Sequence, residues 1–195
     1  MIETNDVRAL FDALAPDWDA ELIRDDRIIG IILQNAGVTE GSKVLDVASG
    51  TGVLIPDYLE WKVQSVTAID LSPEMIRIAR GKYADERVTF IAGDVETEAL
   101  PGEYDVIVVY NAFPHFPDPG RLIRRLSSLL RPGGTLTVAH GMSREEINAR
   151  HADGAKEVSN GLMDAEELAG VFSKYLRVTT VISNEEMYQI AGTRA

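Results

Sequence analysis

The chain contains no cysteine among its 195 residues. Disulfide bonds, thiolate metal sites and cysteine nucleophiles are therefore excluded. Basic residues are also few, 19 Lys and Arg against 31 Asp and Glu, which gives a net charge of −12. Such a chain repels phosphate backbones, so we expect no nucleic-acid partner. We interpret the local arginines as a solvated helix face, with a basic patch for nucleic acid as the alternative: Arg121, Arg124, Arg125 and Arg131.

Long apolar runs are missing as well. No apolar stretch reaches the roughly 18 residues of a membrane span, and residues 1–6 lack the basic and apolar regions of a signal peptide. We therefore expect a cytoplasmic protein that does not insert into a membrane. The length, together with a hydrophobic content of 45%, predicts one domain with its own core and leaves the oligomeric state open.

The first 40 residues have a helical pattern. Val7, Leu10, Phe11 and Leu14 fall on one helix face, and Ala15-Pro16 is expected to end that helix. A second helix is predicted to close near Gly37, and its apolar positions are Leu22, Ile23, Ile28, Ile29, Ile32 and Leu33.

From residue 43 onward, strand and helix patterns alternate. The predicted strands are Val44–Ala48, Val66–Ile69, Val88–Ile91, Tyr104–Tyr110 and Thr135–His140. The predicted helices are Gly52–Trp61, Pro73–Lys82 (with Ser72 as N-cap) and Arg121–Leu130, the last stopped by Arg131-Pro132-Gly133-Gly134. This alternation indicates an α/β protein with a parallel sheet and helices on both faces.

The end of the chain has a different pattern. A predicted helix over Asp164–Lys174 precedes two strand-like runs, Arg177–Ser183 and Met187–Ala191, joined by a short polar link. A link of this length favours a hairpin. The parallel sheet, seven-stranded with these two runs, is therefore expected to end in an antiparallel pair.

The first predicted strand runs directly into a glycine-rich turn, Ala48-Ser49-Gly50-Thr51-Gly52. Glycine lets the backbone approach a ligand closely, and the following helix points its positive N-terminus at that ligand. A dinucleotide fingerprint needs a third glycine, but Ile55 occupies that position. Asp46, inside the strand end, would repel a pyrophosphate and suits a ligand that carries a cation, such as a sulfonium.

Ligands of open parallel sheets bind beyond the carboxyl ends of the strands. Asp70 ends the second strand, where a carboxylate can accept both hydroxyls of a ribose; the alternative is a carboxylate that only stabilises the next helix start. Gly93-Asp94, Asn111–His115 and His140 end the following strands and are expected at the same edge.

Several motifs together resemble the class I S-adenosylmethionine-dependent methyltransferases. Val44–Gly52 resembles their first motif, with Ala48 in place of a glycine, and Val66–Met75 resembles the second. The remaining resemblances are Ile91–Val95 to the adenine motif, Tyr104–Asn111 to the fourth strand and Leu130–Leu136 to the turn into the fifth. The resemblance covers roughly residues 40–140, and it is closest to the small-molecule branch of the family, methyltransferase type 11, which includes quinone-biosynthesis enzymes.

The resemblance implies a single Rossmann-like domain over residues 1–195. Residues 1–40 would form a helical lid, 41–140 the cofactor-binding core, and 141–195 the substrate-side helices and the C-terminal hairpin. S-adenosylmethionine would be the methyl donor and S-adenosylhomocysteine the product. The expected cofactor-binding residues are Trp18, Asp46, Ala48, Gly50, Gly52, Asp70, Leu71, Met75, Gly93, Asp94, Val95 and Asn111.

The N-terminal segment Phe11–Asp19 is similar to the lid segment of that branch. Trp18 is a candidate for closing over the cofactor; the alternative is an ordinary half-buried tryptophan. Methyl transfer mainly requires alignment of two reactants and exclusion of water, and a lid serves both needs.

The three histidines all follow the fourth strand. His115 and His140 are candidates for a general base or an acceptor contact, and His151 ends a helix expected after the capping box Ser143-x-x-Glu146. A three-histidine metal site, completed by Asp17 or Glu145, is the sharper alternative, but the spacing forms no compact motif and we expect no metal. In the resembling branch two adjacent histidines often follow the fourth strand; Pro114 occupies the first of those positions.

We therefore expect methyl transfer to an O, N, S or C nucleophile of a small molecule. The alternatives are an NAD(P)-dependent oxidoreductase and a non-catalytic protein that binds S-adenosylmethionine. The sequence does not identify the acceptor, although residues 141–165 are expected to form part of its pocket.

Overall fold

The computed structural model describes residues 2–154 and 156–195. Its centre is one sheet of seven strands in the order β3-β2-β1-β4-β5-β7-β6. Strands β1 to β5 are parallel, and β7 pairs antiparallel with both β5 and β6. The expected α/β fold with a closing antiparallel pair is confirmed. The strands are β1 (Lys43–Val47), β2 (Ser65–Asp70), β3 (Val88–Ala92), β4 (Tyr104–Tyr110), β5 (Leu130–His140), β6 (Arg177–Ser183) and β7 (Tyr188–Thr193).

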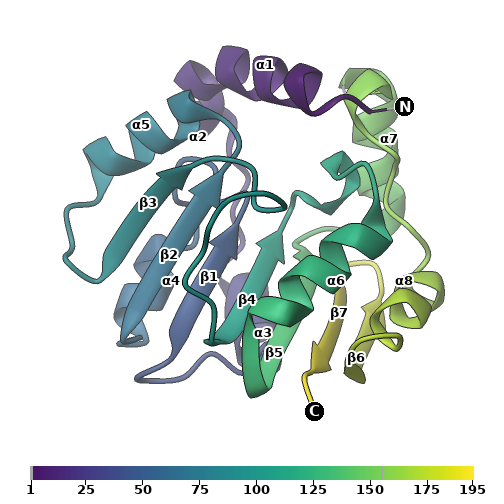
Figure 1. Cartoon of the computed structure of the whole chain (residues 1–195). Helices are drawn as coiled ribbons and strands as arrows, with labels where there is room; N and C mark the ends of the chain where they lie inside the picture. Colours follow the sequence, from purple (N-terminus) through teal and green to yellow (C-terminus); the bar gives the residue numbers. More distant parts are fainter. Residues whose placement is uncertain (1, 155) are drawn as a thin grey trace.

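Helices cover both faces of the sheet, as Figure 1 shows for α6 on the near side and α3 and α4 on the far side. The helices are α1 (Thr4–Leu14), α2 (Trp18–Glu21), α3 (Asp26–Asn35), α4 (Ile55–Glu60), α5 (Pro73–Lys82), α6 (Pro119–Leu129), α7 (Arg144–Gly154) and α8 (Ala165–Phe172). Short 3-10 turns cover η1 (Ala15–Asp17), η2 (Phe113–His115) and η3 (Lys156–Val158).

The protein has two hydrophobic cores, one on each face of the sheet, and strand β4 contributes to both. Its side chains alternate between the faces, so Ile107 and Val109 pack with α6 and α8 while Val106 and Val108 pack with α3, α4 and α5. All four side chains are buried, which fits a central parallel strand covered on both sides. The continuous apolar run of β4 therefore forms a strand with two buried faces.

Several predicted boundaries are wrong by a few residues. The second helix begins at Asp26, capped by Asp25, so Leu22 and Ile23 lie outside it and Ile23 is exposed. The fourth helix starts at Ile55 instead of Gly52, because residues 52–54 complete the turn after β1. Strand β5 starts at Leu130, which pairs with Tyr104 before a register shift, and includes the predicted stop signal.

Other boundaries follow the predicted signals. Helix α5 covers Pro73–Lys82, and the Ser72 hydroxyl accepts from the Met75 amide at 3.1 Å. Helix α6 begins two residues earlier than predicted, because Asp118 caps it by accepting from the Arg121 amide. No described helix is both long and apolar enough to span a bilayer.

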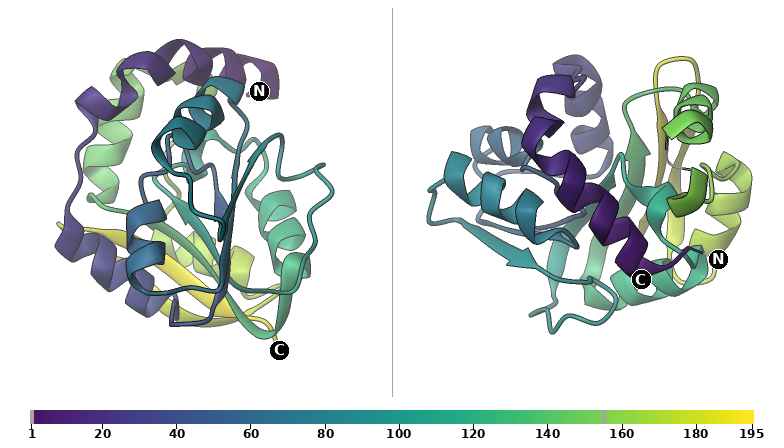
Figure 2. Two further views of the ribbon diagram at one scale, coloured as in Figure 1. Left: turned by 90° about the vertical axis from the view of Figure 1, so that its left-hand side faces the viewer. Right: turned by 90° about the horizontal axis from the view of Figure 1, so that it is seen from above.

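Helix α1 lies across the carboxyl ends of the central strands. Figure 2, in the view from above, shows it crossing between α5 and α7. Val7 on its apolar face packs with Ile2, just before the helix, against Val158 of η3, and Phe11 and Leu71 lie beside them. The N-terminal segment therefore connects two parts of the chain that are far apart in sequence, and it covers the edge where ligands of such sheets bind.

Candidate functional site

A cavity of about 210 Å³ lies at the carboxyl ends of β1, β2 and β4, beneath the N-terminal segment. It combines apolar and aromatic side chains with three carboxylates and two imidazoles. No Lys or Arg of the described chain lines it. Its lining residues are Thr4, Val7, Phe11, Trp18, Leu22, Val47, Ala48, Ser49, Gly50, Val53, Ile69, Asp70, Leu71, Met75, Gly93, Asp94, Val95, Glu96, Tyr110, Asn111, Ala112, His115, Phe116, Pro117 and His151.

The loop after β1 forms one wall of this cavity. Ala48 and Gly50 both have a φ of +54°, a conformation that costs a residue with a Cβ about 1–2 kcal/mol. A Cβ at Gly50 would lie 3.7 Å from Nε1 of Trp18, which places the indole over this loop. The alanine that replaces a glycine here therefore keeps the left-handed backbone of the motif, under strain.

Two of the expected binding residues of this loop do not line the cavity. Asp46 is buried beneath it, and its Oδ2 makes no hydrogen bond to a described protein group. Burial, together with the charges of Asp70 and Asp57, raises the pKa of Asp46 well above its usual range. At Gly52 a Cβ would approach the Tyr83 ring to 2.8 Å, so this glycine makes room for protein packing.

Asp70 is held in place by the backbone on both sides of the cavity. Its Oδ2 accepts from the Gly50 amide at 2.7 Å, and its Oδ1 accepts from the Ser72 amide at 2.9 Å. Burial raises the pKa of Asp70 to about 6, against the opposing effect of these two hydrogen bonds. Each oxygen keeps a lone pair for a ligand, so the carboxylate can accept two further hydrogen bonds.

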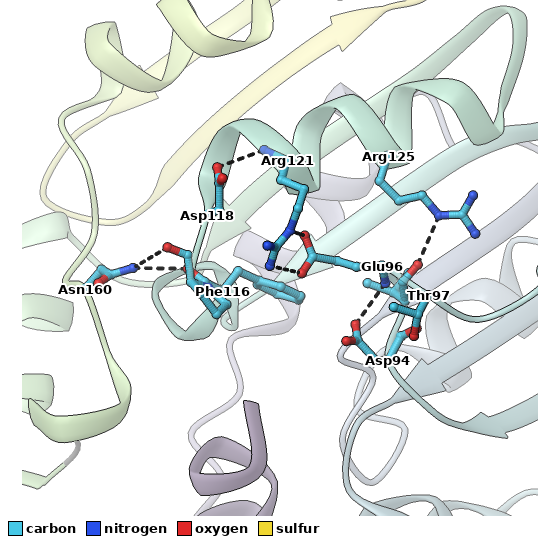
Figure 3. A network of polar contacts seen from close by, with 10 residues as sticks. Asp94, Glu96, Thr97, Phe116, Asp118, Arg121, Arg125 and Asn160 are labelled. Atoms are coloured by element: carbon cyan, nitrogen blue, oxygen red, sulfur yellow. Dashed lines mark hydrogen bonds and ion pairs between the residues drawn. The ribbon is translucent and has the colours of Figure 1, made fainter. Parts of the chain in front are cut away.

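The loop after β3 carries the next expected residues, Gly93, Asp94 and Val95, all of which line the cavity. Asp94 accepts from the Glu96 amide at 2.9 Å, and Glu96 in turn accepts both hydrogen bonds of the Arg121 guanidinium, at 2.8 and 2.7 Å. Figure 3 shows this fork beside Phe116, with Arg125 reaching to the same loop. Helix α6 therefore braces the loop that carries Asp94.

Three of the four arginines that were considered as a basic patch make contacts within the chain. Arg121 pairs with Glu96, Arg125 donates to the carbonyls of Val95 and Glu98, and Arg131 of β5 pairs with Asp105. These three guanidinium groups are therefore engaged by the protein itself.

The N-terminal segment is fastened to the core by two carboxylates. Asp12 accepts from the Ser72 hydroxyl at 2.5 Å, at the N-terminus of α5. Asp19 accepts from the Thr51 hydroxyl at 2.5 Å and from Lys82 at 2.8 Å. Between them Phe11 and Trp18 pack edge to face with centroids 5.7 Å apart, and both line the cavity. The placement of Trp18 over Gly50 fits a covering role.

Two histidines, from η2 and α7, meet at the wall of the cavity. The rings of His115 and His151 lie 4.9 Å apart, and Phe11 packs edge to face on His115 at 4.9 Å. Burial lowers the pKa of His115, against the effect of its hydrogen bond to Val158. Burial, together with the charge of His115, lowers the pKa of His151 to about 4. Both imidazoles are therefore neutral at pH 7.

His140, the other expected base, does not line the cavity. It is 1% exposed, and neither ring nitrogen hydrogen-bonds to a described protein group. Burial lowers its pKa to about 3, with smaller contributions from His151 and His115. Its strand end lies at the same edge as the cavity, but the side chain packs toward Tyr188 of the neighbouring strand, with ring centroids 6.2 Å apart.

The histidine metal site is not formed. Within the described ranges, no three His, Cys, Asp or Glu side chains come together in a group that could hold a metal ion. His115 and His151 are adjacent, but each directs its Nδ1 to a protein oxygen. One nitrogen of each imidazole is therefore engaged in a hydrogen bond to the protein.

The sequence did not reveal that Val158 is the hydrogen-bond partner of His115 or that Ser159 is the partner of His151. The capping box did locate the helix, since the Glu146 amide donates to the Ser143 hydroxyl at 3.2 Å. What the sequence could not show is the return of the chain after α7, which brings residues 158–160 against η2.

Comparisons with known proteins agree with this geometry. The family described as "Methyltransferase domain" matches residues 44–134. The ubiquinone biosynthesis O-methyltransferase of Xanthomonas euvesicatoria is 40% identical over 102 residues, 49% of this chain and 41% of that protein. The chain thus matches less than half the length of this curated relative.

Two solved structures have the same fold over nearly the whole chain. A putative methyltransferase in complex with the Haloferax volcanii Trm112 methyltransferase activator has a TM-score of 0.78 at 22% identity, covering 96% of this chain and 97% of that one. The N-methyltransferase NodS of Bradyrhizobium japonicum, in complex with S-adenosylhomocysteine, has a TM-score of 0.71 at 16% identity and covers 98% of both chains. At these identities the likeness shows the fold.

Proposed function

We propose that this chain, which carries a class I S-adenosylmethionine-dependent methyltransferase domain, transfers a methyl group from S-adenosylmethionine to a nucleophile of a small molecule. The observation that supports this most directly is the cavity at the carboxyl strand ends, whose described lining has three carboxylates and no Lys or Arg. A ligand there carries hydroxyl donors and a cation instead of phosphates.

The lining residues fit such a donor. Asp70 has one free lone pair on each oxygen for the two ribose hydroxyls, and Asp94 lines the neighbouring wall, where it would accept from the adenine amino group. Leu71, Met75 and Val95 supply apolar surface for the purine. Asp46 lies buried beneath the glycine-rich loop, and a bound ammonium or sulfonium group would favour its ionised form.

The same lining argues against an NAD(P)-dependent oxidoreductase. A pyrophosphate needs positive partners or a full glycine fingerprint, and the described lining offers three carboxylates and no Lys or Arg. At Ile55 the third glycine of the fingerprint is missing. The negative charge of a dinucleotide's pyrophosphate would therefore be repelled by Asp70.

When bound, S-adenosylmethionine supplies an activated methyl carbon on a sulfonium sulfur. The chain then has to orient the acceptor and exclude water, and orientation of this kind can contribute roughly 7–11 kcal/mol. The N-terminal segment covers the cavity through Phe11 and Trp18, fastened by Asp12 and Asp19. His115, which lines the cavity and whose pKa is lowered by burial, would accept the acceptor's proton.

A small acceptor suits the covered site. The cavity lies beneath α1 and holds about 210 Å³, and the chain has a net charge of −12. Both features disfavour a nucleic-acid acceptor. Residues on the acceptor side, Phe11, Phe116 and the two histidines, favour a molecule with an apolar ring.

The test is a transfer assay with methyl-labelled S-adenosylmethionine and a panel of small phenols, amines, thiols and enolisable ketones. We expect labelled product together with an equal amount of S-adenosylhomocysteine for at least one class. Tight binding of S-adenosylhomocysteine without transfer to any class would favour the non-catalytic alternative. Absence of binding would overturn the proposal.

A further inference from the structure

The hydrogen bonds behind the two cavity histidines differ in kind. The Val158 carbonyl lies 2.9 Å from Nδ1 of His115, and a carbonyl can only accept. Nδ1 of His115 must therefore carry the hydrogen, which leaves Nε2 with its lone pair. In the neutral ring, the nitrogen of His115 that remains for a ligand is an acceptor.

His151 has a hydroxyl as its partner. Ser159 Oγ lies 2.8 Å from His151 Nδ1 and already accepts from the Gly161 amide at 3.1 Å. The remaining hydrogen of the hydroxyl needs an acceptor, and Nδ1 of His151 is in place to accept it. The hydrogen of neutral His151 then lies on Nε2, so the nitrogen that remains for a ligand is a donor.

We propose that His115 and His151 form a complementary acceptor–donor pair that selects a hydroxyl group as the methyl acceptor, with Ser159 as the positioning residue that sets the tautomer of His151. This inference rests on the proposed methyl transfer and names its nucleophile. A hydroxyl donates to Nε2 of His115 and accepts from Nε2–H of His151 at the same time. An ammonium cannot accept, a ketone cannot donate, and an aromatic amine accepts poorly.

The ring arrangement allows one group to meet both imidazoles. Their centroids are 4.9 Å apart with planes tilted by 51°, and both rings line the cavity. Because both pKa values are lowered, the two rings keep separate tautomers at neutral pH.

The segment after α7 keeps the pair in place. The Asn160 amide donates to the Pro114 carbonyl at 2.9 Å, and its side chain donates to the carbonyls of Phe116 and Pro117, at 3.2 and 3.3 Å. Figure 3 shows Asn160 directed at the Phe116 turn. Residues 158–160 are therefore fixed to η2, the element that carries His115.

The transfer step balances within this arrangement. The hydroxyl oxygen forms the new bond to the methyl carbon, and the carbon–sulfur bond of the donor breaks with its electron pair left on sulfur. The hydroxyl proton goes to Nε2 of His115, which becomes an imidazolium as the sulfonium loses its charge. His151 keeps its proton and donates to the same oxygen throughout.

The first test reads the tautomers directly and needs no acceptor. Nitrogen-15 NMR of the full chain at pH 7.5, assigned with His115→Gln and His151→Gln variants, is expected to show the hydrogen on Nδ1 of His115 and on Nε2 of His151. The Ser159→Ala variant should mix the tautomers of His151, and Ser159→Thr should keep one. The same tautomer in both rings of the unaltered chain would overturn the proposal.

The second test uses matched acceptors, catechol and 1,2-diaminobenzene, with labelled S-adenosylmethionine. We expect transfer to catechol, a roughly tenfold lower kcat/KM in Ser159→Ala through the loss of one hydrogen bond, and recovery in Ser159→Thr. S-adenosylhomocysteine affinity should not change, which separates this inference from the proposed function. Transfer to the diamine in preference to catechol would contradict it.

Discussion

Carboxylates at the two ends of the sheet differ in whether they pair with a basic side chain. At the amino end, Asp105 accepts from the Lys43 amide and pairs with Arg131, and Asp85 pairs with Arg87. At the carboxyl end, Asp46 and Asp70 are buried, and neither pairs with a Lys or Arg of the described residues. The same residue type on neighbouring strands therefore has neutralised charge at one end and available charge at the other.

The pKa directions follow this division. The guanidinium of Arg87 lowers the pKa of Asp85 to about 2, and at Asp105 the Lys43 amide and Arg131 outweigh burial and lower the pKa. Burial raises the pKa of Asp70 to about 6 and that of Asp46 well above its usual range. Burial therefore disfavours the ionised form of Asp46 and Asp70, and a raised pKa at a cavity is typical of functional groups.

The largest expected effect contrasts Asp70 with Asp105. Asp70→Ala should weaken S-adenosylhomocysteine binding about 100-fold, because hydrogen bonds to a charged group contribute about 1.5–3 kcal/mol each. The matched variant, Asp105→Ala, removes a strand-end carboxylate far from the cavity and should leave affinity unchanged. Calorimetric titration measures both, and equal affinities for the two variants would remove the contrast between the ends.

The pH dependence of binding should follow Asp70. Its pKa of about 6 lies above the ordinary 3.8, so the free carboxylate takes up a proton as the pH falls through 6 and then accepts fewer hydrogen bonds. S-adenosylhomocysteine affinity should therefore decrease below pH 6, by at most tenfold per pH unit. Calorimetric titrations between pH 5 and 8 would measure this decrease in affinity. The same pH dependence in the Asp70→Asn variant would show that another group causes it.

Stability should change with opposite sign at the two ends. A raised carboxylate pKa means that stability is lost as the pH rises, so Asp46→Asn should increase the free energy of unfolding at pH 8. A lowered pKa means the reverse, so Asp105→Asn should decrease the free energy of unfolding. Urea unfolding at pH 8 measures both, and two changes of the same sign would contradict the comparison.

The smallest effect concerns the strained loop at the cavity. Ala48→Gly should raise stability by about 0.5 kcal/mol, since relief of the left-handed backbone exceeds the added chain entropy only slightly. Gly50→Ala, at the same φ and with only an ordinary contact between the new Cβ and Trp18, should cost about 1–2 kcal/mol. Thermal unfolding of the two variants would reveal whether residue 48 is strained.

The sequence predicted the fold well because strand β1, its glycine turn and the capped helix α5 are specified by local chemistry. It placed Asp70, Asp94 and Gly50 at one edge because parallel strands end together. Leu22 and Ile23 were assigned to a helix on spacing alone, but Arg24 turns the chain there by donating to Val53 and Asp57.

The surroundings of the three histidines could not be predicted from the sequence. Strand order placed His140 at the right edge, but the direction of its side chain depends on packing against β7. The partners of His115 and His151 come from residues 158–159, whose return to η2 is set by tertiary hydrogen bonds. Such contacts leave no periodic signal in the sequence.

The most direct test of the central claim is a side-by-side calorimetric titration of the unaltered chain with S-adenosylhomocysteine and NADH at pH 7.5. A described lining with three carboxylates and no Lys or Arg predicts saturable one-to-one binding of S-adenosylhomocysteine and none of NADH. Binding of NADH without binding of S-adenosylhomocysteine would contradict the account.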